Sequence, residues 1–99
     1  VDYATGAKPS RVAVGDLNGD GVLDVSAVNE SSNTVSVFQG SASGTLSPKI
    51  DFPTGASPRG LSIGDINADN RPDLVITNSL DNTVSVLNNL VGITPTITG

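Results

Sequence analysis

The stretch Asp16-Leu-Asn-Gly-Asp-Gly-Val-Leu-Asp24 recurs, in altered form, as Asp65-Ile-Asn-Ala-Asp-Asn-Arg-Pro-Asp73. Both copies fit the pattern D-x-N-x-D-[GN]-x-x-D, and they begin 49 positions apart. Asp and Asn at such spacings are typical of a tight turn, because their side chains accept hydrogen bonds from nearby backbone N–H groups and Gly adopts φ > 0 without strain. Each stretch is therefore predicted to be a turn between two strands.

The 49-residue offset extends well beyond the two turns. When residues 2–40 are set against residues 51–89 without gaps, 16 of the 39 positions are identical, and several of the differences exchange one apolar residue for another. The longest shared run reads Asn-Thr-Val-Ser-Val in both copies, at 33–37 and 82–86. A period of this length is typical of stacked supersecondary units, among which four-stranded propeller blades are one case.

Each repeat is predicted to form short strands. In the first repeat, alternating apolar and small residues indicate strands at about 11–16, 23–29 and 34–39, and a fourth is expected at 46–53 after a Gly/Ser loop. No helical apolar period is visible, while 11 glycines and six prolines interrupt the chain. The predicted fold class is all-β, with two four-stranded antiparallel blades that form part of a β-propeller.

The composition narrows the function classes. The chain has 99 residues with no cysteine and no histidine, and ten acidic residues against five basic ones. Without these two residue types there is no disulfide, no zinc-thiolate site and no histidine base, so we expect no enzyme activity. The net charge of −5 disfavours nucleic acid and anionic membranes as partners, and no membrane insertion is expected. Six of the ten acidic residues lie in the two turns, so the acidity is local.

The two turns are expected to bind a hard cation. Oxygens at positions 1, 3 and 5 of such a turn converge, and position 7 presents its carbonyl, as in the first half of an EF-hand loop. Position 12, where an EF-hand has its Glu, holds Ala27 or Ile76, which excludes a helical EF-hand. The predicted ligands are Asp16, Asn18, Asp20, the Val22 carbonyl and Asp24 in the first turn, and Asp65, Asn67, Asp69, the Arg71 carbonyl and Asp73 in the second.

Calcium fits this ligand set better than magnesium, which keeps its waters and demands octahedral geometry. We therefore expect two Ca²⁺ per chain. The alternative is a solvated hairpin whose Asp and Asn side chains bond only to their own backbone. Two copies in the same register weigh against that alternative, because carboxylates this close repel one another unless a cation lies between them.

With these residues in view, the sequence resembles a known family. Val12-Ala-Val-Gly15, the first acidic turn and Asn33-Thr-Val-Ser-Val37 together look like the FG-GAP or VCBS repeat, the blade unit of integrin-α-like β-propellers. The resemblance covers about residues 2–89. It implies a blade with calcium in the loop between its first two strands, and a role outside the cell or at the cell surface. Such propellers usually have roughly six to eight blades, whereas this chain holds two.

We divide the chain into a first repeat at 1–50, a second repeat at 51–89 and a divergent tail or linker at 90–99. Residues 1–6 match 50–55, so they are predicted to be the outer strand of a blade. Stacked units are not expected to be stable below about three repeats. We expect three or four chains to associate in a closed ring, with the N-terminal strand of one chain completing the second blade of the next. The alternative is that the chain is part of a longer propeller.

The leading functional expectation is a calcium-binding module for extracellular binding or adhesion, with a carbohydrate or protein ligand. The alternative is a structural scaffold or spacer whose calcium only stabilises loops. Tyr3 and Phe38 are expected to be core residues rather than part of a binding patch. Asn29 and Asn78 are expected to serve the turns that follow them.

Overall fold

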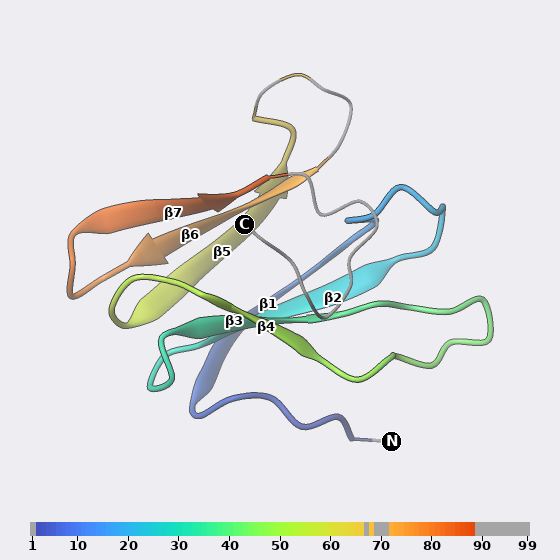
Figure 1. The fold of residues 1–99 in the computed structure, drawn as a ribbon, viewed down its shortest axis with the longest axis horizontal. Helices are drawn as coiled ribbons and strands as arrows, with labels where there is room; N and C mark the ends of the chain where they lie inside the picture. Colours follow the sequence, from blue (N-terminus) through green and yellow to red (C-terminus); the bar gives the residue numbers. More distant parts are fainter. Residues whose placement is uncertain (1, 67, 69–71, 89–99) are drawn as a thin grey trace.

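The computed structural model describes residues 2–66, 68 and 72–88, and these form two antiparallel sheets (Figure 1). The strands of the first sheet, in spatial order, are β1 (Pro9–Gly15), β2 (Asp24–Asn29), β3 (Thr34–Phe38) and β4 (Ile50–Pro53). Those of the second are β5 (Pro58–Gly64), β6 (Asp73–Asn78) and β7 (Thr83–Leu87). The described residues contain no helix, and thus none that could cross a membrane. The predicted all-β class with antiparallel sheets is confirmed.

The repeat in the sequence is also a repeat of the backbone. β1, β2 and β3 coincide with β5, β6 and β7 after a shift of 49 residues, and both first strand pairs carry an irregularity just after their opening proline. Asn33 and Asn82, which precede the third strands, have φ of 56° and 55°. Asn adopts this left-handed conformation more readily than most residues, so each tight turn forms with little strain.

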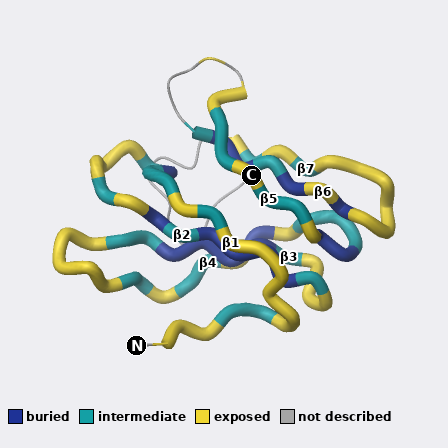
Figure 2. The backbone as a smooth tube through the Cα atoms, turned by 180° about the vertical axis from the view of Figure 1, so that it is seen from behind, coloured by how far each residue is buried: buried dark blue, intermediate teal, exposed yellow. Residues whose placement is uncertain are grey.

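The hydrophobic core lies where the two sheets face each other. Its fully or nearly fully buried members come from both sheets and from the first acidic turn: Leu17, Val28, Val35, Val37, Phe52, Leu74 and Ile76. The tube view shows this buried backbone in dark blue in the middle of the molecule, while the N-terminal segment and several loop tips are exposed (Figure 2). Burial of these side chains is the main favourable term that holds one repeat on the other.

Two expectations about the aromatic residues have different outcomes. Phe38 is buried, as predicted, with 4% of its surface exposed. The prediction for Tyr3 is wrong, because 37% of its surface is exposed. Its ring lies 6.2 Å from that of Phe38, centroid to centroid, on the face of the first sheet that the second sheet does not cover.

The fourth strand begins at Ile50 rather than at residue 46. Before it, Leu46 forms an isolated bridge with Gly40. Pro48 has no N–H to donate to a ladder, and regular pairing with β3 resumes only two residues later. Residues 2–6 belong to no strand of this chain, and the tail predicted at 90–99 lies outside the described residues. The division into repeats and tail stays a prediction.

Candidate metal centre

The first acidic turn joins β1 to β2 at one end of the first sheet. Gly15 and Asp24 are paired across the two strands, so the residues on either side of the turn lie close together. Leu17, the second residue of the turn, is fully buried in the core between the sheets. The Leu17 side chain therefore anchors the turn in the core, while the polar side chains of the turn form hydrogen bonds within the loop.

Asp16 organises the backbone of this turn. Its Oδ1 accepts hydrogen bonds from the N–H groups of Gly19 at 2.8 Å and Asp20 at 3.2 Å, and its Oδ2 accepts one from Gly21 at 2.8 Å. The glycines have φ of 78° and 81°, a conformation that costs Gly little. The Gly21 N–H above all, followed by the other two, holds the pKa of Asp16 below its ordinary value. The carboxylate is thus ionised at neutral pH.

Asp24 closes the turn from inside the protein. Its side chain is fully buried, and its two oxygens accept hydrogen bonds from the N–H groups of Leu17 and Gly40, both at 2.9 Å. Gly40 belongs to the connection that follows β3, and a Cβ there would lie 2.0 Å from the Leu23 carbonyl oxygen. The close approach that only glycine permits thus lets Asp24 join the acidic turn to a second loop.

Three carboxylates converge in this loop. Asp16, Asp20 and Asp24 each offer an oxygen, and the three oxygens lie within 4.8 Å of one another. Asn18 and Val22 lie in the same loop, where Asn18 Oδ1 accepts from the Asp20 N–H at 3.3 Å and the Val22 N–H donates to Asp20 Oδ1 at 2.9 Å. Carboxylates this close repel one another, and a cation between them would remove that repulsion.

The second turn repeats the part of this geometry that the structure describes. The Ile66 N–H donates to Asp73 Oδ2 at 2.9 Å, as the Leu17 N–H does to Asp24. Ala68 takes the place of Gly19 and keeps the left-handed conformation, with φ of 59°. The predicted ligands Asn67, Asp69 and Arg71 lie outside the described residues.

Asp73 differs from its counterpart in one respect. It is fully buried, and its Oδ1 has no hydrogen-bond partner in the described part of the chain. A buried carboxylate oxygen without a partner is costly, because it has lost its water and gained nothing in exchange. The matching oxygen of Asp24 accepts from the Gly40 N–H, and the residue that matches Gly40 lies outside the described residues.

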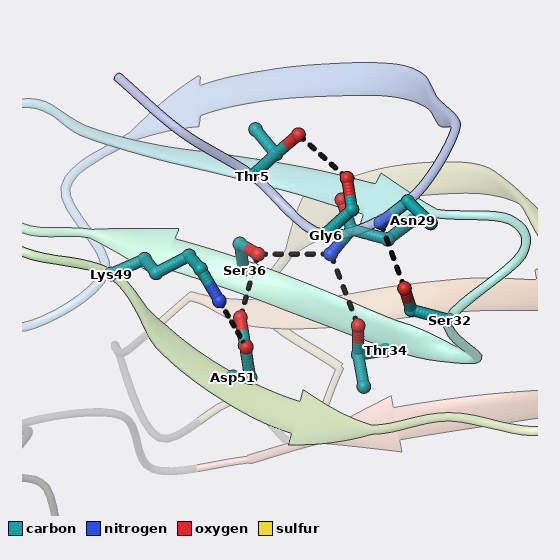
Figure 3. Close-up of polar contacts among 9 residues, drawn as sticks. Thr5, Gly6, Asn29, Ser32, Thr34, Ser36, Lys49 and Asp51 are labelled. Carbon is teal, nitrogen blue, oxygen red and sulfur yellow. Dashed lines mark hydrogen bonds and ion pairs between the residues drawn. The ribbon is translucent and has the colours of Figure 1, made fainter.

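Sequence reasoning missed a second polar cluster, centred on Asn29. This side chain is not devoted to the following turn. It is fully buried, and its Nδ2 donates to Thr34 Oγ1 at 3.1 Å and to Ser36 Oγ at 2.9 Å (Figure 3). Ser36 in turn donates to Asp51 Oδ1 at 2.7 Å. Asn78 makes the same two side-chain contacts in the second sheet. The predicted turn role holds for the backbone of Asn29, whose carbonyl accepts from the N–H groups of Ser32 and Asn33, while its side chain serves the buried network.

The signal for this cluster was present in the self-alignment. Asn, Thr, Ser and Asp are identical between the repeats at all four of these positions. Identity of polar residues at neighbouring strand positions indicates a hydrogen-bonded network around a buried member, because a buried donor needs its acceptor.

Two stacked all-β repeats, each with an acidic turn between its first two strands, define a β-propeller repeat module. A family model described as the FG-GAP-like repeat matches residues 16–76, which is more than half of the chain. The chain therefore belongs to the FG-GAP-like repeat family, as the resemblance predicted. We found no match among curated proteins and none among solved structures.

Proposed function

We propose that this repeat module binds calcium at its acidic turns and serves extracellular binding or adhesion. The observation that carries the calcium proposal is the convergence of the Asp16, Asp20 and Asp24 oxygens within 4.8 Å. Asp16 accepts hydrogen bonds from backbone N–H groups of the loop, and these bonds hold the loop in shape before an ion binds. A cation would then bind with little loss of loop freedom.

The ligand chemistry favours calcium. Three carboxylates, the Asn18 amide oxygen and the Val22 carbonyl would supply five oxygens, which leaves one or more positions for water within the ~6–8 that Ca²⁺ takes. The lowered pKa of Asp16 means that no proton has to leave that group at neutral pH.

Isothermal titration calorimetry of the chelator-treated chain tests the calcium proposal. We expect about two Ca²⁺ per chain, and about one for Asp20→Asn, because this change removes one charge and keeps an oxygen for the Val22 N–H. Asp81→Asn makes the same charge change in the turn after β6 and should bind like the parent chain. Undiminished stoichiometry and affinity in Asp20→Asn would contradict the assignment.

The extracellular role is proposed from the family and from the class of site. Propeller modules outside the cell meet calcium at high concentration, where sites of modest affinity, about 10⁻⁴–10⁻³ M, are filled. The proposed ligand is a carbohydrate or a protein. Arrays of glycans and of matrix proteins, probed with the labelled chain in calcium and in chelator, should show calcium-dependent binding.

A structural scaffold is the second candidate. The hydrogen bonds of Asp24 favour it, because they already connect the acidic turn to the loop at Gly40 and calcium would reinforce that connection. If calcium binds and raises stability but the arrays show no ligand, the scaffold function replaces the binding function.

A further inference from the structure

The second sheet ends at β7, whose outer edge is not paired within the described residues. In the first sheet, β4 covers the edge of β3, with Thr34 opposite Pro53, Val35 opposite Phe52 and Ser36 opposite Asp51. In the second sheet, β7 has a neighbour on one side only within the described residues, which is β6. A strand edge of this kind carries unpaired N–H and C=O groups and is a template for an added strand.

The two sheets also leave unequal faces exposed. Leu17, Val35 and Val37 of the first repeat are fully buried under the second sheet. Their counterparts Ile66, Val84 and Val86 are exposed to 60%, 58% and 43%. These three residues form the outer patch of the second sheet.

A complementary patch lies on the other side of the molecule. Leu61 and Ile63 of β5 pack against the core between the sheets. Their counterparts in β1, Val12 and Val14, are exposed. The outer patch of the second sheet and this face of the first sheet are thus the two halves of an interface that the chain already forms once within itself.

Residues 7–8, which lead into β1, make the same hydrogen bonds as residues 56–57, which lead into β5. The Ala7 N–H donates to Ser32 Oγ at 2.8 Å, and the Glu30 N–H donates to the Lys8 carbonyl at 2.9 Å. In the second repeat, the Ala56 N–H donates to Asp81 Oδ2 at 2.8 Å, and the Ser79 N–H donates to the Ser57 carbonyl at 3.0 Å. Residues 7–8 therefore repeat these two contacts of their counterpart with the sheet that follows, and residues 2–6 pair with no strand within the described residues.

One contact that the counterpart makes with the following sheet is missing at the N-terminal segment. In the second repeat, the Gly55 N–H donates to Asn78 Oδ1 at 3.0 Å. The corresponding Asn29 Oδ1 is buried and has no partner within the described residues, although a Cβ on Gly6 would lie only 2.8 Å from Asn29 Cγ. Seating residues 2–6 as a strand is expected to bring the Gly6 N–H onto this acceptor.

A second incomplete contact lies at the open edge itself. Asn78 Nδ2 donates to Ser85 Oγ at 2.8 Å, as Asn29 does to Ser36. The Ser36 hydroxyl in turn donates a hydrogen bond to Asp51, which lies on β4, the strand that covers that edge of the first sheet (Figure 3). The residue that matches Asp51 in the repeat is Asp2.

We propose that a second copy of this chain docks at β7 head to tail. Its residues 2–6 add to β7 as the fourth strand, with Ala4 opposite Thr83, Tyr3 opposite Val84 and Asp2 opposite Ser85. Its first sheet covers the outer patch of the second sheet. Because the two surfaces differ, each copy keeps one of them free for the next copy, and three or four chains close a ring. This association does not depend on the proposed calcium sites.

Disulfide trapping tests this register directly, since the chain has no cysteine of its own. Thr34 and Pro53 face each other without hydrogen bonds between them, the arrangement in which side chains of paired strands come closest. Mixed under mild oxidation, Ala4→Cys chains and Thr83→Cys chains are expected to give a cross-linked heterodimer as the main product. Ala4→Cys mixed with Leu80→Cys is the control, because Leu80 is 76% exposed and its counterpart Ser31 is exposed as well.

Light scattering of the full 99-residue chain gives an independent readout. We expect a mass of three or four times 10.0 kDa, in calcium and in chelator alike, and a shift to monomer in Val84→Glu with folded circular dichroism. The proposal is overturned if the parent chain is monomeric at all concentrations, if residues of the same chain cover β7 so that no heterodimer forms, or if the Leu80 control cross-links equally well. Products linked only through identical positions would show a two-fold contact and overturn it too.

Discussion

Leu17 and Ile66 hold the same place in the two acidic turns, yet their surroundings differ. Leu17 is fully buried because the second sheet lies over the face of the first sheet to which it belongs. Ile66 is 60% exposed because no sheet among the described residues lies over its own face. The stability that an apolar side chain contributes is set here by what packs on it rather than by its type.

This pair gives a prediction for stability. Leu17→Ala should lower the free energy of unfolding by roughly 2–5 kcal/mol, because it leaves a cavity in the core. Ile66→Ala should change the stability of the single chain by at most about 0.5 kcal/mol. Urea unfolding of both variants, at a concentration where the chain is monomeric, provides the comparison. Equal losses would show that the two turns are buried alike in solution.

At this scale the convergence of the Asp16, Asp20 and Asp24 oxygens could be predicted, because Asp and Asn at fixed spacings carry their own local geometry. The exposure of Tyr3 could not, because it depends on a Phe38 ring that is distant in sequence and on which surfaces meet in space. The buried role of Asn29 was missed, although the identity of its polar partners in both repeats carried the signal.

Among the elements, the repeat offset located the strands well. Their recurrence after 49 residues follows from two sequences that share turn residues and the same apolar alternation. The start of β4 was harder to predict, because apolar residues begin at Leu46 whereas Pro48 delays the ladder to Ile50. That residues 2–6 pair with no strand of their own chain agrees with the sequence expectation, which assigned them as an outer strand to the second blade of the next chain.

The outer strand β4 should make folding depend on pH through Asp51. Burial raises the pKa of this carboxyl, but the Lys49 ammonium and the Ser36 hydroxyl more than offset it, so the pKa in the folded state lies below its ordinary value of 3.8. A depressed pKa contributes stability above the unfolded-state value, and that contribution is lost as pH falls through the folded-state value.

We therefore expect the unfolding free energy to decline as pH is lowered from about 5 toward 2, and Asp51→Asn to flatten part of that decline. Guanidinium unfolding at a series of pH values measures both slopes. Lys49→Gln should produce part of the same flattening, because it removes the cation that lowers the pKa of Asp51. An unchanged slope in both variants would show that the β4 ion pair has no role in the pH response.

At the scale of the molecule, the two sheets form one interface with each other and, among the described residues, leave two apolar surfaces uncovered. The same fact explains the exposed valines on β7, the exposed valines on β1 and the N-terminal segment that lacks a sheet edge. The charge has an equally local origin. Filling both acidic turns with Ca²⁺ would bring the net charge of −5 close to neutrality, and self-repulsion would fall accordingly.

The most direct test of the central proposal, that the acidic turns are calcium sites, is the thermal unfolding midpoint as a function of free calcium. A ligand at about 100 times its Kd stabilises the folded state by roughly 2.7 kcal/mol, which for a chain of this size corresponds to an increase in Tm of roughly 10 °C or more. We predict that increase for the parent chain and a smaller one for Asp20→Asn, with magnesium largely ineffective. An identical Tm in calcium and in chelator would contradict the account.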